Sequence, residues 1–146
     1  MKIICLRGIS GSGKSTLANQ LATEAISSGL TAEICCADDF MMVDGKYEWR
    51  QEKLGWAHRC CQEQARLACE KKTDLVLISN TNLPARDRKP YIGLAEQYGY
   101  GFELLMVGDF TEEFAKLCAA RNTHAVPEGH LLKVAARFRG TEGLTR

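Results

Sequence analysis

The feature that most constrains this chain is a glycine-rich stretch, G-I-S-G-S-G-K-S-T, which begins at Gly8. Four residues separate Gly8 from Gly13, and Lys14 and Ser15 follow directly. This spacing is typical of a loop that surrounds a phosphate group, provided that a strand precedes it and a helix follows. The apolar run 2–7 predicts such a strand, and the helical spacing of the apolar residues after the loop predicts the helix.

Each residue type in the loop has a physical reason to be there. Glycines let the backbone curl so that several N–H groups point at one phosphate, and the helix N-terminus adds its positive end. We expect Lys14 to reach the β- and γ-phosphates of ATP and the Ser15 hydroxyl to bind Mg²⁺. The loop residues expected to bind the nucleotide are Gly8, Ser10, Gly11, Ser12, Gly13, Lys14, Ser15 and Thr16.

The rest of the chain alternates between strand and helix patterns. Strands are predicted over 2–7, 31–36, 74–79 and 102–107, and later helices over 51–71, 86–98, 111–121 and up to about 138. Such alternation predicts an α/β fold with a parallel sheet sandwiched by helices, as in P-loop NTPases and kinases. With 146 residues and no linker or repeat, we expect one domain over 1–146 whose last residues are frayed.

Composition excludes few classes of protein, but it indicates where in the cell we expect this one. The net charge is +1, so no bulk field favours nucleic acid or an acidic membrane surface. The seven cysteines show no zinc spacing and mostly lie in apolar segments, which favours free core thiols in a reducing cytosol. No apolar run is long enough for a signal peptide or a membrane span. We therefore expect a cytoplasmic protein without a membrane partner.

Polar residues at the ends of the predicted strands indicate the chemistry, because ligands of such sheets bind beyond the carboxyl ends of the strands. Asp38 and Asp39 follow the second strand, where a carboxylate takes a proton from an attacking hydroxyl or holds metal-bound water. On extended backbone these neighbours point in opposite directions, so we expect one in the site and the other in a structural role. Which of the two faces the site stays open at this point.

The third strand ends in Asn80, where an acid would support attack by water. This argues against a motor-type ATPase, and the absence of N-K-x-D and D-x-x-G motifs after the loop argues against a GTPase switch. A transferase that moves phosphate to an organic acceptor remains.

The stretches S-G-S-G-K-S-T, D-D-F, S-N-T-N-L and R-N-T-H-A-V-P occur in this order. Together they resemble the polynucleotide 5′-hydroxyl kinase branch of P-loop kinases, over about residues 2–138. The resemblance implies that Asp38 is the general base and that Lys14 and Ser15 bind the ATP phosphates and Mg²⁺. It also implies a helical lid over about 119–130, whose Arg121 contacts the ATP phosphates.

The same resemblance implies an acceptor that is a nucleic acid or a nucleotide. Thr81 and Val126 match positions that contact the acceptor nucleotide in the family. Met41 stands where the phage enzyme of this family has an arginine that binds the acceptor phosphate. The sequence therefore supports the kinase chemistry more strongly than the polynucleotide acceptor.

Several other side chains are candidates for the acceptor side. Tyr47 and Trp49 follow an Asp-Gly turn and are placed to stack on an acceptor base, whereas Trp56 is expected in the core. His124 lies in the expected lid, where contact with the nucleotide and exposure to solvent are both compatible with the sequence. The basic cluster at 86–89 fits acceptor phosphates or a solvated helix face equally well.

Three functions are compatible with these patterns. The first is an ATP- and Mg²⁺-dependent kinase that acts on a 5′-hydroxyl of a polynucleotide or nucleotide. The second is a kinase of another small hydroxyl metabolite or nucleoside. The third is a non-catalytic regulator that binds ATP and a protein partner.

Overall fold

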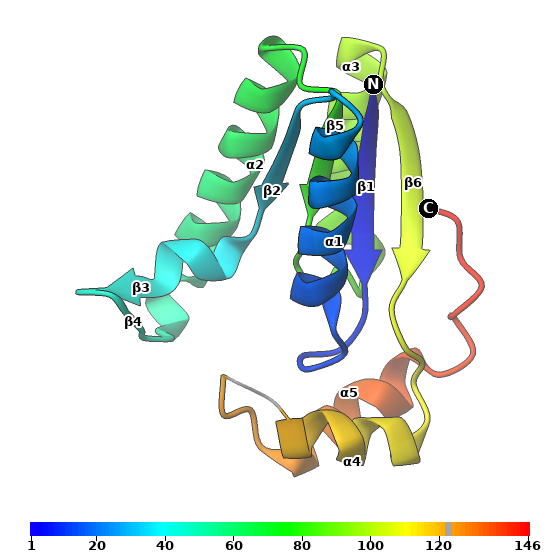
Figure 1. Cartoon of the computed structure of the whole chain (residues 1–146). Coiled ribbons are helices and arrows are strands. Elements are labelled where there is room, and N and C mark those ends of the chain that lie inside the picture. The colour runs from blue at the N-terminus through cyan, green and yellow to red at the C-terminus, as the bar shows by residue number, and fades with distance from the viewer. Residues whose placement is uncertain (122–123) are drawn as a thin grey trace.

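A parallel four-stranded sheet forms the centre of the computed structural model, which describes residues 1–121 and 124–146. Its strands in spatial order are β2 (Ala32–Cys35), β5 (Leu75–Ile78), β1 (Lys2–Arg7) and β6 (Gly101–Met106). All of them run in the same direction, so their carboxyl ends meet at one edge of the sheet (Figure 1). The predicted α/β architecture is therefore confirmed.

Helices cover both faces of the sheet. They are α1 (Lys14–Ser27), α2 (Leu54–Glu70) and α3 (Ala85–Tyr98). Successive side chains of a strand point to opposite faces. Accordingly, Ile3 and Cys5 of β1 pack with α2 and α3, whereas Ile4 and Leu6 pack with α1. A strand that is buried on both faces explains the unbroken apolar run at the start of the chain.

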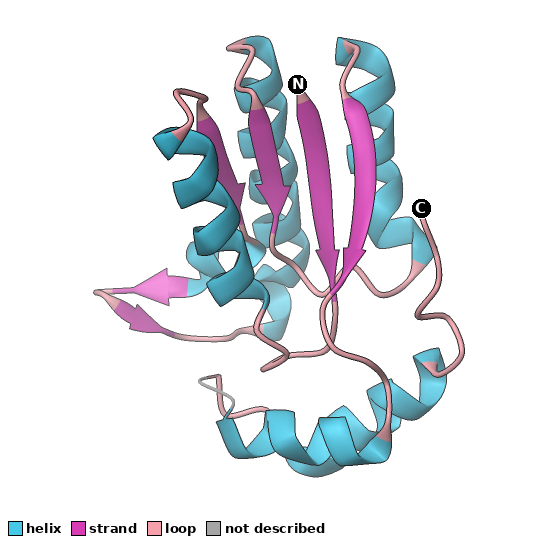
Figure 2. Ribbon diagram, turned by 45° about the vertical axis from the view of Figure 1, so that its right-hand side comes forward, coloured by secondary structure: helices cyan, strands magenta, loops and turns pink. Residues whose placement is uncertain are grey.

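Two further helices, α4 (Glu112–Arg121) and α5 (Glu128–Phe138), lie beyond the carboxyl ends of the strands. Figure 2 shows them separate from the helices that flank the sheet. They pack on each other through a small apolar cluster that includes Phe110, Leu131 and Ala135, all fully or nearly fully buried. The two helices therefore lie over the edge of the sheet where ligands of such folds bind.

The segment between β2 and α2 differs from the extended chain that we expected. Residues 37–41 form a 3₁₀ helix, η1 (Ala37–Met41), which is followed by a hairpin of β3 (Met42–Val43) and β4 (Lys46–Tyr47). A second 3₁₀ turn, η2 (Gln51–Lys53), leads into α2. Positive φ angles of 51° at Asp44 and 79° at Gly45 confirm the tight Asp-Gly turn.

The last residues are tied to the body of the protein rather than frayed. Arg7 is 1% exposed, and its guanidinium donates to the backbone oxygens of Thr141 and Leu83 at 2.8 and 3.0 Å. Arg139 donates to the Phe110 oxygen at 2.9 Å. The expectation of a frayed tail is wrong because a buried arginine at the end of β1 uses the tail carbonyl as a partner.

All seven cysteines lie in the described residues and carry free thiols. Five of them are buried, as expected for small apolar side chains. Within the described part of the chain, every helix is too short or too polar to cross a bilayer.

Candidate active site

A cavity of about 650 Å³ lies at the carboxyl edge of the sheet, between the glycine-rich loop, η1, the β3–β4 hairpin and the end of α4. It combines cationic groups on one side with carboxylates on the other. The residues that line it are Ser10, Gly11, Gly13, Lys14, Ser15, Thr16, Cys36, Asp38, Asp39, Met42, Tyr47, Ser79, Asn80, Thr81, Arg121 and His124. The structure thus brings together most of the residues that the sequence placed in one site.

The conformation of the loop explains two of its glycines. Gly13 has a φ of 105° and Gly11 one of 82°, which side chains with a Cβ rarely adopt. A Cβ on Gly11 would also lie 2.7 Å from the backbone oxygen of Cys118 in α4. The loop therefore passes so close to α4 that only glycine fits there.

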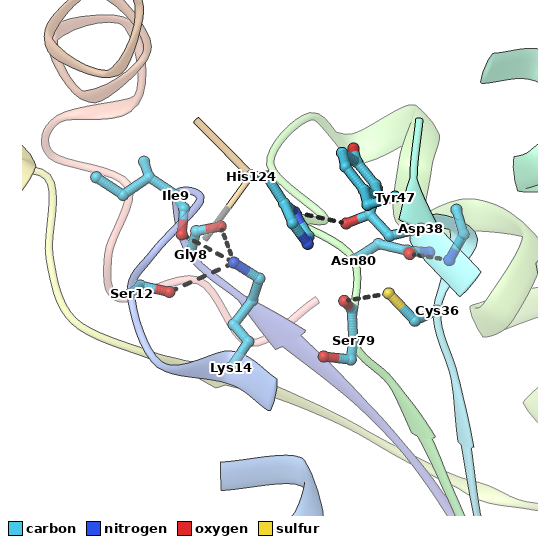
Figure 3. Close-up of polar contacts among 11 residues, drawn as sticks. Gly8, Ile9, Ser12, Lys14, Cys36, Asp38, Tyr47, Ser79, Asn80 and His124 are labelled. Atoms are coloured by element: carbon cyan, nitrogen blue, oxygen red, sulfur yellow. Dashed lines mark hydrogen bonds and ion pairs between the residues drawn. The ribbon is translucent and has the colours of Figure 1, made fainter. Parts of the chain in front are cut away.

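Lys14 is folded back over its own loop. Its Nζ donates to the backbone oxygens of Gly8 and Ile9 at 3.0 and 2.8 Å, and lies 3.4 Å from Ser12 Oγ (Figure 3). The side chain is buried, and this burial lowers the pKa of Lys14 to about 8. A partly desolvated cation at the centre of a phosphate-binding loop interacts more strongly with an anion than an exposed lysine would.

Arg121 comes from the end of α4 and reaches the same loop. Its Nε donates to the Gly11 oxygen at 2.8 Å and its Nη2 to the Ser12 oxygen at 3.2 Å. The guanidinium lies 5.6 Å from the ring centre of Phe114. Arg121 therefore stands at the cavity beside the loop, while the neighbouring positions 122 and 123 of the R-N-T-H stretch lie outside the described residues.

Both acids of the Asp38-Asp39 pair line the cavity, so the expectation that only one faces the site is wrong. The pair lies in η1, where neighbouring residues are turned by about 120° rather than pointing in opposite directions. Burial, and then the charge of Asp38, raise the pKa of Asp39. Asp39 is the more exposed residue of the pair, and 44% of the Asp38 side chain is exposed.

Two aromatic side chains surround the Asp38 carboxylate. The Tyr47 hydroxyl donates to Oδ1 at 3.2 Å, and His124 Nδ1 lies 3.4 Å from Oδ2. The rings of Tyr47 and His124 are stacked, with centres 4.1 Å apart and planes 9° from parallel. Figure 3 shows both rings beside the Asp38 carboxylate. A residue from the hairpin and one from the segment between α4 and α5 thus meet at Asp38.

Asn80 has a structural task that the sequence did not reveal. It is 8% exposed; its Oδ1 accepts the backbone N–H of Ala37 at 2.8 Å, and its Nδ2 lies 3.5 Å from Cys61 Sγ. Ala37 begins η1, so this amide fixes the start of the helix that carries Asp38.

Sequence reasoning missed Asn82 in the same loop. Its Nδ2 donates to Leu6 O at 2.7 Å and to Ile78 O at 3.2 Å, and thereby joins the ends of β1 and β5. The residue is 1% exposed and has a φ of 52°, a conformation that asparagine tolerates. The second asparagine of the S-N-T-N stretch was the available signal, because buried amides at strand ends need backbone partners.

Two of the expected acceptor residues lie elsewhere. Met41 is 1% exposed and packs in the core between the sheet and α2, because η1 turns its side chain inward. Its neighbour Met42, 48% exposed, lines the cavity instead. Val126 packs against the α4–α5 cluster and is not among the lining residues, whereas Thr81 is.

Other candidates also need correction. Trp56 was expected in the core but is 46% exposed, with its ring 6.0 Å from that of Phe40. Arg88 neither faces the cavity nor is solvated, because it is 4% exposed and donates to the backbone oxygens of Asn82 and Leu83. The basic cluster at 86–89 is therefore split between a buried structural arginine and exposed neighbours.

The residues of the cavity fit a magnesium ion that is held mainly by substrate phosphates. Within residues 1–121 and 124–146, no group of three acidic, histidine or cysteine side chains forms a metal site of its own. Ser15 lines the cavity, and the Ser79 hydroxyl is buried there with no hydrogen-bond partner among the described residues. Mg²⁺ keeps several waters when phosphates hold it, so it needs few protein ligands, and the Ser15 hydroxyl suits that task.

Comparison with known proteins gives matches over nearly the whole chain. A family model described as an AAA domain, AAA_33, matches residues 3–141. NEDD4-binding protein 2 of Homo sapiens is 34% identical over 136 residues, which are 93% of this chain and 8% of that protein. The chain thus spans a small part of the length of this curated relative.

Two solved structures show the same fold at lower identity. A chain of the Pnkp1/Rnl/Hen1 RNA repair complex is 20% identical with a TM-score of 0.69, covering 94% of this chain and 43% of that one. The Mycobacterium tuberculosis APS kinase CysC in complex with AMPPNP and APS is 17% identical with a TM-score of 0.66, covering 99% and 82%. The predicted P-loop kinase fold is thereby confirmed.

Proposed function

We propose that this chain, which belongs to the AAA_33 family of AAA domains, transfers the γ-phosphoryl group of ATP to a 5′-hydroxyl of a polynucleotide or nucleotide. Its fold is that of nucleotide-binding phosphotransferases. The observation that carries the proposal is the division of one cavity into two chemical halves. Lys14 and Arg121 stand beside the glycine-rich loop, and the partly exposed carboxylate of Asp38 lies in the same cavity.

In the proposed reaction, the acceptor oxygen attacks the γ-phosphorus while the bond to the β–γ bridging oxygen breaks and ADP leaves. Asp38 takes the proton of the acceptor hydroxyl, which is the task of a general base in this chemistry. Lys14 and Arg121 offset the negative charge on the transferred group and on the leaving oxygen. The backbone amides of the loop hold the phosphates in line for the attack.

Magnesium would be held by the Ser15 hydroxyl, which lines the cavity, and by the phosphates of ATP. When bound, it would supply positive charge that offsets the charge of the phosphates. The protein's own contribution is to place Ser15 at the start of α1, next to Lys14. We count Thr16, which also lines the cavity, with the nucleotide-binding residues.

The choice of acceptor rests on two kinds of support. The ordered motifs resemble polynucleotide 5′-hydroxyl kinases, and a chain of an RNA repair complex shares the fold. The similarity to an APS kinase, which covers 99% of this chain, supports a small nucleotide as the alternative acceptor. We also propose that the chain acts as one domain and in the cytoplasm, and that Thr81 contacts the acceptor because it lines the cavity.

The test is transfer of labelled γ-phosphate to a panel of acceptors: 5′-hydroxyl DNA, 5′-hydroxyl RNA, 3′-nucleoside monophosphates, nucleosides, adenosine phosphosulfate and water. We expect transfer to a 5′-hydroxyl. Asp38→Asn is expected to lower that transfer by about 10²–10⁴-fold, the range for loss of a general base, with ATP affinity unchanged.

Asp44→Asn is the matched control, because it makes the same chemical change in the same segment at an exposed turn position where asparagine also fits. It should keep wild-type transfer. Failure on every 5′-hydroxyl acceptor would overturn the polynucleotide proposal in favour of a small-molecule kinase. Binding of ATP without transfer to any acceptor would instead favour a non-catalytic regulator.

A further inference from the structure

We infer that Tyr47 is a positioning residue that acts through Asp38: its hydroxyl holds Oδ1 of the carboxylate so that Oδ2 is presented to the acceptor hydroxyl. The inference rests on the proposed role of Asp38 as general base. The inference adds a residue of the β3–β4 hairpin to the residues that the sequence assigned to the reaction, which are Lys14, Asp38 and Arg121. The sequence suggested Tyr47 only as a stacking platform for an acceptor base.

The hydrogen bond itself is the first support. Tyr47 lies at the end of β4 and reaches back across the hairpin to η1, where its hydroxyl donates to Asp38 Oδ1 at 3.2 Å. A carboxylate oxygen that accepts such a bond is held in one rotamer. Because Asp38 is 44% exposed and lies in a 3₁₀ helix of five residues, local packing alone leaves its side chain poorly constrained.

The anchoring of both partners is the second support. The Tyr47 ring packs against the core cluster between the sheet and α2, so its hydroxyl has a fixed origin. The backbone of η1 is fixed independently, through the bond from Ala37 N–H to Asn80 Oδ1 and through Glu48 N–H, which donates to Met41 O at 2.8 Å. The Tyr47–Asp38 bond therefore joins two rigid elements rather than two mobile side chains.

The hydroxyl remains a donor over the whole range in which the enzyme would work. Burial, followed by the charge of Asp38, raises the pKa of Tyr47 to about 12. A phenol that keeps its proton donates to the carboxylate and never competes with it as a base. The Tyr47 hydroxyl therefore stays a donor to Oδ1 near neutral pH.

His124 marks the other oxygen. Its Nδ1 lies 3.4 Å from Oδ2, and its ring is stacked on Tyr47. With Oδ1 held by the tyrosine, we expect the acceptor hydroxyl to approach Oδ2, beside which His124 lies (Figure 3). Tyr47 therefore sets both the direction of the base and the position of the histidine beside it.

Tyr47→Phe tests the inference, because it removes one oxygen atom and keeps the ring that stacks on His124 and packs on the core. We expect kcat for phosphoryl transfer to fall about tenfold, because Asp38 is still present as the base but is no longer held in one orientation. The acceptor KM and the Kd of ATP should stay within about twofold of wild type. A purely structural role would instead lower the melting temperature or raise both constants.

Tyr100→Phe is the matched control. Its hydroxyl also donates a buried bond, to Thr73 O at 2.7 Å, but Thr73 and Tyr100 precede β5 and β6 at the opposite edge of the sheet. This variant should lose stability and keep kcat. A Tyr47→Phe enzyme with wild-type kcat, or with the loss confined to KM or ATP binding, would overturn the inference.

The outcome for Asp38→Asn separates this inference from the proposed function. If Asp38→Asn loses transfer while Tyr47→Phe does not, the base stands and only the positioning role falls. If Asp38→Asn retains transfer, or if the wild-type protein transfers phosphate to no acceptor, the proposed function and the inference fall together.

Discussion

The two halves of the cavity are built in different ways. The half that would hold ATP comes from a contiguous stretch, residues 8–16, whose backbone groups bind and whose glycines permit the conformation. The half that would hold the acceptor is made by side chains from η1, the β3–β4 hairpin and the lid, with Asp38, Tyr47 and His124 in contact. Backbone-built sites are specified locally, whereas side-chain sites need several elements in register.

Arg121 connects the two halves of the cavity, because it lies at the end of α4 and its side chain donates to backbone oxygens of the glycine-rich loop. We expect Arg121→Ala to lower phosphoryl transfer on the order of 10³-fold, the scale of an arginine that stabilises charge in the transition state. Single-turnover transfer measures the effect, and melting temperature shows whether the loop contact also matters for stability. Arg121→Lys keeps the charge but not the fork of donors, so recovery of full activity by lysine would refute the role.

Met41 and Met42 give the sharpest contrast on the acceptor side, since the two neighbours face opposite environments. Met41→Ala should lower the free energy of unfolding by about 2–5 kcal/mol, because it empties space in the core. Met42→Ala should change it by no more than about 0.5 kcal/mol, because the side chain is largely exposed. Urea denaturation measures the free energy of unfolding of both variants. Equal losses of stability in the two variants would contradict the placement of η1.

The smallest predicted effect is the change of ATP affinity with pH, which depends on Lys14 of the glycine-rich loop. Burial lowers the pKa of Lys14 to about 8, and a bound phosphate favours the charged form. ATP affinity is therefore highest below pH 8, where Lys14 is charged. It falls as the pH rises through 8, by up to about tenfold per pH unit. The phosphates of ATP and the thiol of Cys36, whose pKa burial raises to about 12, keep their charge states in this range.

Calorimetric Kd values for ATP between pH 7.5 and 9.5 measure this slope. Lys14→Arg is the control, because a guanidinium does not titrate here and should flatten the profile even where it weakens binding. A wild-type affinity that is constant to pH 9.5 would show that Lys14 leaves its buried position before ATP binds.

The order of strands and helices was predictable because period-2 and helical spacing and turn residues are local properties of the chain. The largest error was the Asp38-Asp39 segment, which the sequence presented as extended. Its 3₁₀ helix depends on Asn80, more than forty residues away in sequence, whose amide binds the first residue of η1. That distant bond decided that both acids face the cavity and that Met41 does not.

The sequence by itself determined the glycine-rich loop with Lys14, the parallel α/β order and the position of the Asp38-Asp39 pair after the second strand. Each of these depends on residues that are neighbours along the chain. Only the tertiary structure decided that Tyr47 and His124 meet at Asp38 and that Arg7 and Arg88 are buried in structural bonds. Such contacts join separate elements, and their geometry exists only once the sheet, the hairpin and the lid have packed.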